Sequence, residues 1–340
     1  MKNKVLVTGG TGYIGSHTVI DLMDNGFDVI SVDNFINSSP NALENIAAVT
    51  GVPIKNYAVD LVDLEALGAV FAENEDLVGI IHFAALKSVG ESVNKPWDYF
   101  YNNLNGLLNV IKCAETFAVP NLIFSSSCSV YGNTDALPVV EETPMKEAES
   151  PYARTKQMGE HILQDYAKAH PDFKTILLRY FNPAGAHESA KIGEAPTSNA
   201  TNLVPVITAT AMGKRKALTV FGDDYDTRDG SCVRDYIHIM DLANAHTKAL
   251  QYLIANNNQA NCEVFNVGLG AGATVLEAIK AFEQASGQQL DYTIGGRRAG
   301  DVVAIYANND KATSLLGWQP KRDIEDIMRT AWEWEQVRGA

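Results

Sequence analysis

The sequence is poor in paired cysteines and in long apolar runs. Its cysteines at positions 113, 128, 232 and 262 are widely spaced and form no CxxC pair, which excludes a disulfide framework and a cysteine-based metal motif. We expect free thiols in a reducing compartment. There is no run of about 18 uninterrupted apolar residues. The N-terminus, MKNKVLVTGG, enters a strand pattern without the apolar region of a signal peptide. We therefore expect a cytoplasmic protein.

Basic residues are also fewer than acidic residues. The chain has 27 Lys and Arg against 41 Asp and Glu, a formal net charge of −14. This balance argues against nucleic acid or an anionic membrane as the main partner, although local arginines still allow an anionic small substrate. The seven histidines show no HxxxH or HxH spacing, so we expect no metal site.

The first half of the chain alternates short apolar runs with helical patterns. Its 340 residues are enough for about two domains. The predicted strands are Lys4–Val7, Asp28–Val32, Val78–Phe83, Asn121–Ser125 and Lys174–Arg179, and the main helices are 16–25, 97–117 and 152–169. Strands that alternate with helices indicate an α/β fold with a Rossmann-type, doubly wound parallel sheet.

The pattern changes after about residue 182. Residues 183–235 are rich in Gly, Pro, Asn and Thr, a helix and a strand return in 236–267, and the remainder is mostly helical. We predict a larger sheet domain of residues 1–182 plus about 236–267. A smaller, mixed α/β domain would combine about 183–235 with 268–340.

A glycine-rich turn joins the first strand to the first helix. The segment is TGGTGYIG, residues 8–15, with glycines at 9, 12 and 15. Such glycines allow a tight turn, a close approach to a pyrophosphate, and packing of the helix on the sheet. The helix N-terminus adds N–H groups and a partial positive charge. The flanking strand and helix therefore predict a dinucleotide site.

An acidic residue follows the second strand at the distance this fingerprint requires. Asp33 can accept hydrogen bonds from the adenosine ribose and would repel a 2′-phosphate, which favours NAD over NADP. The alternative is an aspartate that only caps a turn. Asp60, between Val59 and Leu61, is a weaker candidate for contact with adenine, because an isolated strand-end aspartate is as often a turn former.

Two further motifs suggest proton transfer. SSSCSVYG, residues 125–132, follows a strand, and ligands of open α/β sheets bind at the carboxyl ends of strands. Ser150 and Pro151 then mark a helix start, which places Tyr152 and Lys156 on one helix face. A phenol has a pKa near 10, and lowering it by about 3 units requires roughly 4 kcal/mol. An ammonium, a helix N-terminus and an oxidised nicotinamide could together supply that.

The glycine turn, the strand-end serine and the Tyr-x-x-x-Lys pair resemble the extended short-chain dehydrogenase/reductase superfamily. Longer segments resemble one family within it, the UDP-glucose 4-epimerases. They are GYIGSHT (12–18), DNFINSS (33–39), HFAALKSVGESVNKP (82–96), NNLNG (102–106), SSSCSVYG (125–132), LRYFNPAGAH (178–187), VRDYIHIMDLA (233–243) and GRRAGDV (296–302). Together they are spread over nearly the whole chain.

The resemblance implies an NAD-dependent, redox-neutral isomerase of galactose metabolism that interconverts UDP-galactose and UDP-glucose. In that family the tyrosine takes the proton of the sugar 4-hydroxyl while a hydride passes to tightly bound NAD. The 4-keto sugar turns over and receives the hydride on its other face. Carried onto this chain, Ser127 and Tyr152 handle the 4-oxygen, and Lys156 tunes Tyr152 and holds the nicotinamide ribose.

The resemblance also implies two sets of binding residues. The cofactor set is Gly9, Gly12, Tyr13, Ile14, Gly15, Asp33, Asn34, Asn37, Ser38, Asp60, Leu61, Phe83, Ala84, Ala85, Lys87, Asn102, Ser125, Tyr152, Lys156 and Tyr180. The substrate set is Lys87, Ser127, Tyr152, Asn182, Asn202, Leu203, Phe221, Arg234, Arg298, Asp301 and Ile305. Arg234 and Arg298 suit a pyrophosphate on chemical grounds as well, because guanidinium groups are fork-shaped donors.

One position departs from the best-known pattern. The family carries side chains of varied size, including Tyr and Cys, where this chain has Ile305, and the resemblance implies that this side chain limits room around the sugar C2 substituent. Ile is smaller than Tyr but stiff. We therefore expect that UDP-N-acetylhexosamines are also accepted.

Two rival functions share the fold. A nucleotide-sugar 4,6-dehydratase would place an Asp-Glu pair at the positions of Cys128 and Ser129, neither of which is a credible acid or base at neutral pH. A non-catalytic dinucleotide sensor would be expected to lack the base, yet Ser127, Tyr152 and Lys156 are all present. The resemblance further implies a homodimer formed through the helices at 97–117 and 152–169.

Overall fold

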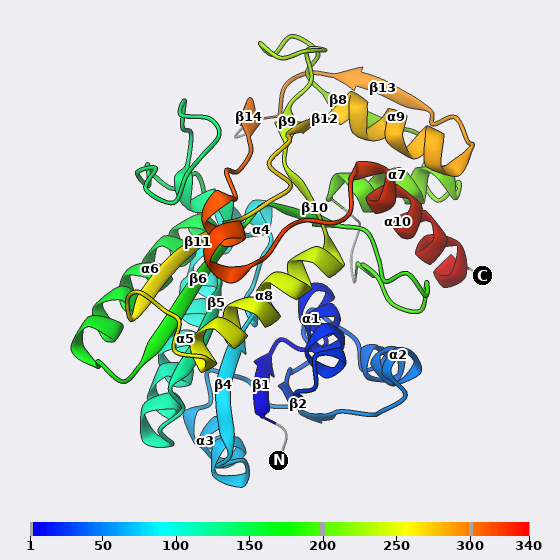
Figure 1. Ribbon diagram of the computed structural model, residues 1–340. Helices are drawn as coiled ribbons and strands as arrows, with labels where there is room; N and C mark the ends of the chain where they lie inside the picture. The colour runs from blue at the N-terminus through cyan, green and yellow to red at the C-terminus, as the bar shows by residue number, and fades with distance from the viewer. Residues whose placement is uncertain (1–2, 197–200, 299–301, 340) are drawn as a thin grey trace.

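A parallel sheet forms the centre of the molecule (Figure 1). The computed structural model describes residues 3–196, 201–298 and 302–339, and within them seven strands form this sheet in the order β11-β6-β5-β4-β1-β2-β3. These strands are β1 (Lys4–Thr8), β2 (Asp28–Val32), β3 (Lys55–Tyr57), β4 (Leu77–His82), β5 (Asn121–Ser125), β6 (Lys174–Tyr180) and β11 (Cys262–Val267). The strand order reverses between β1 and β4, the point at which doubly wound sheets bind ligands. The predicted fold class is confirmed.

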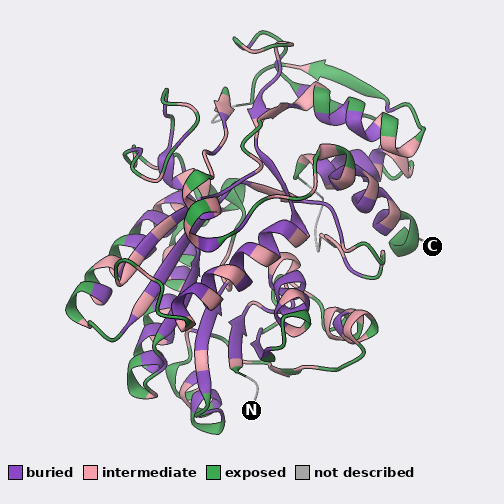
Figure 2. Cartoon of the chain, in the orientation of Figure 1, coloured by how far each residue is buried: buried purple, intermediate pink, exposed green. Residues whose placement is uncertain are grey.

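Helices cover both faces of this sheet. One face is covered by α1 (Tyr13–Asp24), α2 (Asn41–Thr50) and α8 (Ile239–Ile254), and the other by α3 (Leu64–Glu73), α5 (Pro96–Thr116) and α6 (Pro151–Ala169), with α4 (Val89–Asn94) beside α5 and α6. The strands are buried almost throughout, as Figure 2 shows. Apolar strand residues therefore face a helix layer on either side, which explains their nearly continuous hydrophobic runs.

A second group of elements lies above the carboxyl ends of the sheet strands (Figure 1). Its core is an apolar cluster that includes Ile207, Phe282 and Trp332. The elements are α7 (Leu203–Ala211), β8 (Leu218–Phe221), α9 (Val275–Ser286), β13 (Tyr292–Gly295) and α10 (Ile324–Gly339). Short strands link it to the sheet: β7 (Asn182–Ala184) with β10 (Tyr236–His238), and β9 (Val233–Arg234) with β12 (Ala273–Thr274) and β14 (Ala304–Ile305). The short helical turns are η1 (Cys128–Tyr131) and η2 (Ala312–Leu316).

The structure adds elements that the sequence pattern did not indicate. The segment expected to be mostly helical, 268–340, also contains β12, β13 and β14, and α2, β3 and α3 were not predicted. Strands of two to four residues are too short to display period-two alternation. In the part of the chain that the structure describes, no helix is long and apolar enough to cross a membrane.

Candidate active site

The glycine turn between β1 and α1 lies close to the segment that follows β4. Gly9 has a positive φ of 70°, and a Cβ there would lie 2.8 Å from the backbone N of Ala84. A Cβ on Gly15 would lie 2.1 Å from the carbonyl oxygen of Gly9. Among the described residues no side chain caps the start of α1 at Gly12. The first N–H groups of this helix, including those of Tyr13 and Ile14, therefore remain available for an anion.

Tyr13 also anchors α1 to the segment that follows β7. Its hydroxyl donates a 2.6 Å hydrogen bond to the carbonyl oxygen of Gly185. The start of α1 is thereby joined to the second group of elements. The turn at residues 9–15 accordingly fits a pyrophosphate that lies between the two parts of the molecule.

Asp33 follows β2 and is nearly buried, with 9% of its surface exposed. Its carboxylate accepts hydrogen bonds from the Thr11 N at 3.1 Å, the Phe35 N at 2.9 Å and the Ser38 Oγ at 2.8 Å. The Ser38 Oγ also lies 2.8 Å from the Thr11 Oγ1. A carboxylate has about four acceptor positions, so Asp33 is held beside the glycine turn with room for a ribose hydroxyl.

Four further residues of the predicted cofactor set lie on the segments that follow β2 and β3. Asn34 donates from Nδ2 to the Asp60 Oδ2 at 3.1 Å, which joins the ends of two neighbouring segments. Asn37 is exposed in the turn after β2, and Leu61 is buried. The structure thus places Asn34 and Asn37 after β2, and Asp60 and Leu61 after the edge strand β3.

The segment after β4 is tied to the end of β1. The Phe83 N donates to the Thr8 O at 3.0 Å, and the Ala84 N donates to the Thr8 Oγ1 at 3.4 Å. The Phe83 ring centre lies 4.6 Å from that of His246. Ala85 is half-buried and Lys87 is exposed. This segment therefore forms one wall of the switch point between β1 and β4.

Asn103 is a positioning residue that the sequence analysis missed. It accepts from the Leu86 N at 2.8 Å and donates to the Leu86 O at 3.0 Å and the Thr155 Oγ1 at 3.2 Å. Asn102, the residue that was predicted, donates from Nδ2 to the Asn103 Oδ1 at 2.9 Å. Asn103 ties the segment after β4 to the first turns of α6. The sequence feature that could have identified Asn103 is an amide side chain on the apolar face of the amphipathic helix α5.

Tyr152 and Lys156 lie on one face of α6, as their spacing predicts. Ser150 caps this helix by accepting from the Ala153 N at 3.2 Å, so Tyr152 lies in its first turn. The Lys156 Nζ lies 5.9 Å from the centre of the Tyr152 ring and donates to the Ser125 O at 2.6 Å. The lysine is 6% exposed. The Tyr152 phenol, the Lys156 ammonium and the serines at the end of β5 therefore lie close together.

The protein groups around Tyr152 raise its pKa, whereas the sequence analysis expected Lys156, the helix N-terminus and an oxidised nicotinamide together to lower it. Burial is the main cause, followed by the nearby Tyr180, while a hydrogen bond with Ser127 lowers the pKa and Cys128 adds to the rise. Burial also lowers the pKa of Lys156 to about 8, partly opposed by a carboxylate on the same helix. The surroundings thus disfavour both charged forms, and a further positive charge is needed to favour the phenolate.

Two serines at the end of β5, Ser125 and Ser127, have different partners. The Ser125 hydroxyl is hydrogen-bonded to the Tyr180 hydroxyl. The Ser127 Oγ accepts from the Ser129 N at 3.2 Å. The pKa of the neighbouring Cys128 is raised to about 12 by burial, with Arg234 opposing that rise. Ser127 is thus the serine beside Tyr152, and Arg234 lies close to the same turn.

The predicted uridine and pyrophosphate residues come from the second group of elements. Arg234 on β9 donates from Nη1 to the Val233 O at 2.9 Å and the Val302 O at 2.6 Å. The Arg298 guanidinium lies 5.6 Å from the centre of the Phe221 ring, at the end of β8. Asp301 lies outside the described residues.

Asn182 and Asn202 mark the starts of two elements in this group. Asn182 begins β7, and its N–H donates to the Asp235 O at 2.9 Å. Asn202 directly precedes α7, which begins at Leu203, and donates to the Glu194 Oε1 at 3.0 Å. Both asparagines thus lie at element ends, where backbone and side-chain groups can meet a ligand.

Ile305 lies on β14 beside Arg234 on β9. It is 6% exposed and belongs to an apolar cluster with Val130, Tyr131 and Phe181. The cluster joins β14 to the turn that carries Ser127. A change of side chain at 305 therefore acts close to the predicted catalytic residues.

Metal ligands are not grouped in the described part of the chain. No cluster of three or more His, Cys, Asp or Glu side chains among residues 3–196, 201–298 and 302–339 is arranged to hold a metal ion.

Comparison with known proteins agrees with this geometry. A family model described as GDP-mannose 4,6 dehydratase matches residues 6–331. UDP-glucose 4-epimerase of Bacillus subtilis is 45% identical over 331 residues, which is 97% of this chain and 96% of that protein. The structure of UDP-glucose 4-epimerase from Bifidobacterium longum, in complex with NAD⁺ and UDP, superposes with a TM-score of 0.94 at 45% identity and covers 99% of both chains.

A further relative is the UDP-Glc/GlcNAc 4-epimerase of Campylobacter jejuni. It superposes with a TM-score of 0.84 at 38% identity, over 98% of this chain and 99% of that one. Identity at this level over nearly the full length, together with the placement of Tyr152 and Lys156, is decisive. The chain belongs to the UDP-glucose 4-epimerase family of the extended short-chain dehydrogenases/reductases.

Proposed function

We propose that this chain interconverts UDP-galactose and UDP-glucose by inverting the configuration at C4 of the sugar. The observation that carries this proposal is the proximity of Tyr152, Lys156 and the serines at the end of β5. NAD, when bound, supplies the hydride acceptor and returns the hydride, so the overall reaction is redox-neutral. The enzyme is accordingly an isomerase.

Side chains of this protein carry out the proton transfer. Tyr152 removes the proton of the 4-hydroxyl and returns it later, and Ser127 hydrogen-bonds to the phenol and to the sugar oxygen. Lys156 supports the phenolate with its ammonium, whose charge is partial near its pKa of about 8. The oxidised nicotinamide would add the positive charge that the surroundings of Tyr152 require.

The residues at the switch point fit NAD. The glycine turn packs its backbone too tightly for a Cβ at positions 9 and 15, α1 begins with available N–H groups, and the carboxylate of Asp33 lies beside the turn. A carboxylate at this point favours a ribose diol over a 2′-phosphate. We assign the cofactor to residues 1–182 plus about 236–267, and the UDP-sugar to about 183–235 plus 268–340.

The dehydratase description of the matching family model suggests an alternative reaction. Dehydration would need an acid and a base next to Ser127, where this chain has Cys128 and Ser129. Burial raises the pKa of the Cys128 thiol to about 12, so it stays protonated at neutral pH. Without a carboxylate pair there, epimerisation is the reaction that this site supports.

Substrate scope extends, in our proposal, to UDP-N-acetylhexosamines. Ile305 lies beside the predicted pyrophosphate residue Arg234 and leaves more room than a tyrosine would. The relative from Campylobacter jejuni is described as acting on both UDP-Glc and UDP-GlcNAc. Turnover of UDP-N-acetylgalactosamine by the purified chain tests this extension, and no turnover of that substrate would overturn it.

We also propose a cytoplasmic homodimer formed through α5 and α6. Large apolar side chains are exposed on these two adjacent helices: Trp97 is 74% exposed, Tyr101 50%, Leu108 46% and Met158 38%. Large exposed apolar side chains on adjacent helices support an interface between subunits at this face. Light scattering of the purified chain should give twice the mass of one chain, and Leu108→Glu should shift it to the monomer.

A test of the main proposal uses the cofactor balance. The purified chain is denatured and its supernatant is analysed for NAD, and the native chain is assayed without added cofactor. We expect released NAD and interconversion of UDP-glucose and UDP-galactose. Stoichiometric consumption of external NAD(H) would instead identify a net oxidoreductase and overturn the proposal.

A further inference from the structure

Glu160 lies one helical turn beyond Lys156 on α6 and is completely buried. It pairs with Arg179 on β6, whose side chain is 4% exposed. The Arg179 Nη2 donates to the Glu160 Oε2 at 2.7 Å, and the Arg179 Nε donates to the Glu160 Oε1 at 2.9 Å. This is a two-point, charge-assisted contact in the interior of the sheet domain.

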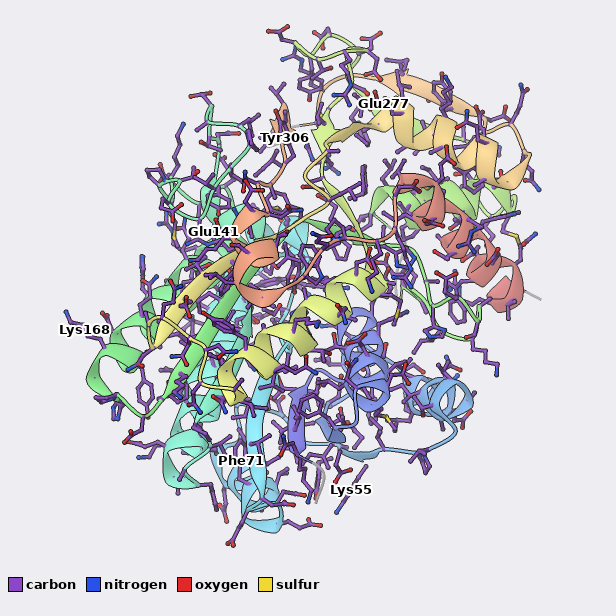
Figure 3. All side chains as sticks on the ribbon, viewed as in Figure 1. Lys55, Phe71, Glu141, Lys168, Glu277 and Tyr306 are labelled. Carbon is purple, nitrogen blue, oxygen red and sulfur yellow. The ribbon has the colours of Figure 1, made fainter. Side chains whose placement is uncertain are left out.

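Further hydrogen bonds fix the guanidinium. Its Nη1 donates to the Tyr131 hydroxyl and to the Glu141 O, both at 3.1 Å. Glu141, labelled in Figure 3 beside β11, accepts through Oε1 from the Asn266 N at 2.8 Å. A buried ion pair is weak evidence for stability, because desolvation offsets its attraction. The connections of this pair therefore point to another role.

Ser126 joins the pair to the predicted catalytic residues. Its hydroxyl donates to Glu160, and its N–H donates to the Leu178 O at 2.9 Å. In the chain it lies between Ser125, whose carbonyl accepts from Lys156, and Ser127, which hydrogen-bonds to Tyr152. A shift of Ser126 would move both neighbours together.

Gly159 permits this connection. A Cβ at this position would lie 2.7 Å from the Phe124 Cζ, so α6 packs unusually close to β5. The close approach lets Glu160 reach the turn at the end of that strand. The Lys156 Nζ lies 5.0 Å from the Phe124 ring centre on the same side. The helix that carries the catalytic pair is therefore fixed against the serine turn at two successive turns.

We propose that the Glu160–Arg179 pair acts through Ser126 as a positioning element for catalysis. It fixes the turn at residues 125–127, so that the Ser125 carbonyl holds Lys156 and the Ser127 hydroxyl meets Tyr152. This inference rests on the proposed epimerase function. The three residues need not touch substrate, and they act only through the groups that do.

The first test removes the link and keeps the ion pair. Ser126→Ala should lower kcat for UDP-galactose by about 10- to 100-fold, because a small misplacement of reacting groups has effects of that size. KM and the amount of bound NAD should remain those of the wild type. Ser92→Ala is the matched control, since this buried hydroxyl donates only to the Val89 O on α4. It should retain the wild-type kcat.

The second test removes both charges together. Glu160→Gln alone would leave a buried guanidinium unpaired and could prevent folding, so it is combined with Arg179→Met. This double variant should fold and should lose at least as much kcat as Ser126→Ala.

The outcomes separate the two proposals. A wild-type chain that interconverts no UDP-sugar overturns the proposed function. An active wild type with an unchanged kcat in Ser126→Ala or in the double variant overturns the positioning role. The positioning role is also overturned if the loss of kcat is proportional to a loss of bound NAD or of folded protein, both measured on the same samples.

Discussion

The Lys156 ammonium lies near the phenol of Tyr152, the predicted catalytic base, with its Nζ 5.9 Å from the centre of the Tyr152 ring and 2.6 Å from the Ser125 O. The lysine is thus held by a backbone carbonyl and not by the phenol itself. Its charge influences Tyr152 through space, which leaves the phenol free to meet a sugar hydroxyl. This arrangement explains how one lysine can serve both the tyrosine and the serine turn.

Removal of the phenol should abolish proton transfer and leave the fold intact. Tyr152→Phe should lower kcat by about 10²- to 10⁴-fold, the range typical of a general acid–base group. Bound NAD should be retained, because the glycine turn is unchanged. Tyr166→Phe is the matched control on the same helix, where the Tyr166 ring stacks on that of His170. Wild-type kcat in Tyr152→Phe would contradict its assignment.

The buried lysine should make stability depend on pH. Burial lowers the pKa of Lys156 from 10.5 to about 8 in the folded chain. Below pH 8 both the folded and the unfolded state carry the proton, and the folded state bears the full desolvation penalty. Between pH 8 and 10.5 the unfolded state binds more protons, so stability rises with pH. The gain is roughly 3 kcal/mol for a shift of this size.

Comparison with Lys156→Met isolates this contribution. Urea unfolding of the nucleotide-free chain is measured at pH 7 and pH 10 for both proteins. The free energy of unfolding of the wild type should rise relative to that of the variant between these values. A constant difference between the two proteins would show that the lysine has an ordinary pKa.

The glycine turn should not tolerate a methyl group at its last position. In Gly15→Ala the new Cβ would lie 2.1 Å from the Gly9 O and 2.9 Å from the Gly10 Cα, both backbone atoms. The turn must therefore open, and the purified variant should contain little NAD. Gly68→Ala on α3 is the control, because its Cβ meets no atom within 4 Å. That variant should keep its NAD and gain up to about 1 kcal/mol from helix propensity.

Asp33 should determine the choice of nucleotide. In Asp33→Asn the amide keeps the shape of the side chain but loses the negative charge that would repel a 2′-phosphate. The preference for NAD over NADP should fall by about tenfold or more, since a hydrogen bond to a charged group contributes about 1.5–3 kcal/mol. Titration of the nucleotide-free chain with each cofactor measures this. An unchanged preference would mean that Asp33 only organises its turn with Thr11 and Ser38.

The residues predicted to carry out the reaction were easier to identify from the sequence than the buried residues that hold them in position. The Tyr-x-x-x-Lys spacing, the serine cap at 150 and the glycine turn are local patterns, and the structure places them as predicted. The family prediction is confirmed by the relatives. The sequence did not indicate Asn103 or the Glu160–Arg179 pair, because apart from the neighbouring Asn102 their partners are 17 to 52 positions away.

Electrostatics gave the clearest difference between expectation and structure. From the sequence, a helix N-terminus, a lysine and an oxidised nicotinamide together should lower the pKa of Tyr152, and the structure shows the effect of the protein groups alone. In the folded chain, burial raises this pKa and lowers that of Lys156. Desolvation depends on how many neighbouring atoms exclude water, a quantity that a local pattern does not contain.

The size of residue 305 should control which sugars are accepted. Ile305→Tyr fills space beside β9 and should reduce turnover of UDP-N-acetylgalactosamine relative to UDP-galactose by about 10-fold or more, the discrimination typical of a steric pocket. Val303→Tyr is the control, because Val303 is 40% exposed. The ratio of kcat/KM for the two sugars is the measurement. Since Ile305 is packed against Phe181 and Val130, an equal loss for both sugars would indicate disturbed packing and would contradict its role in selectivity.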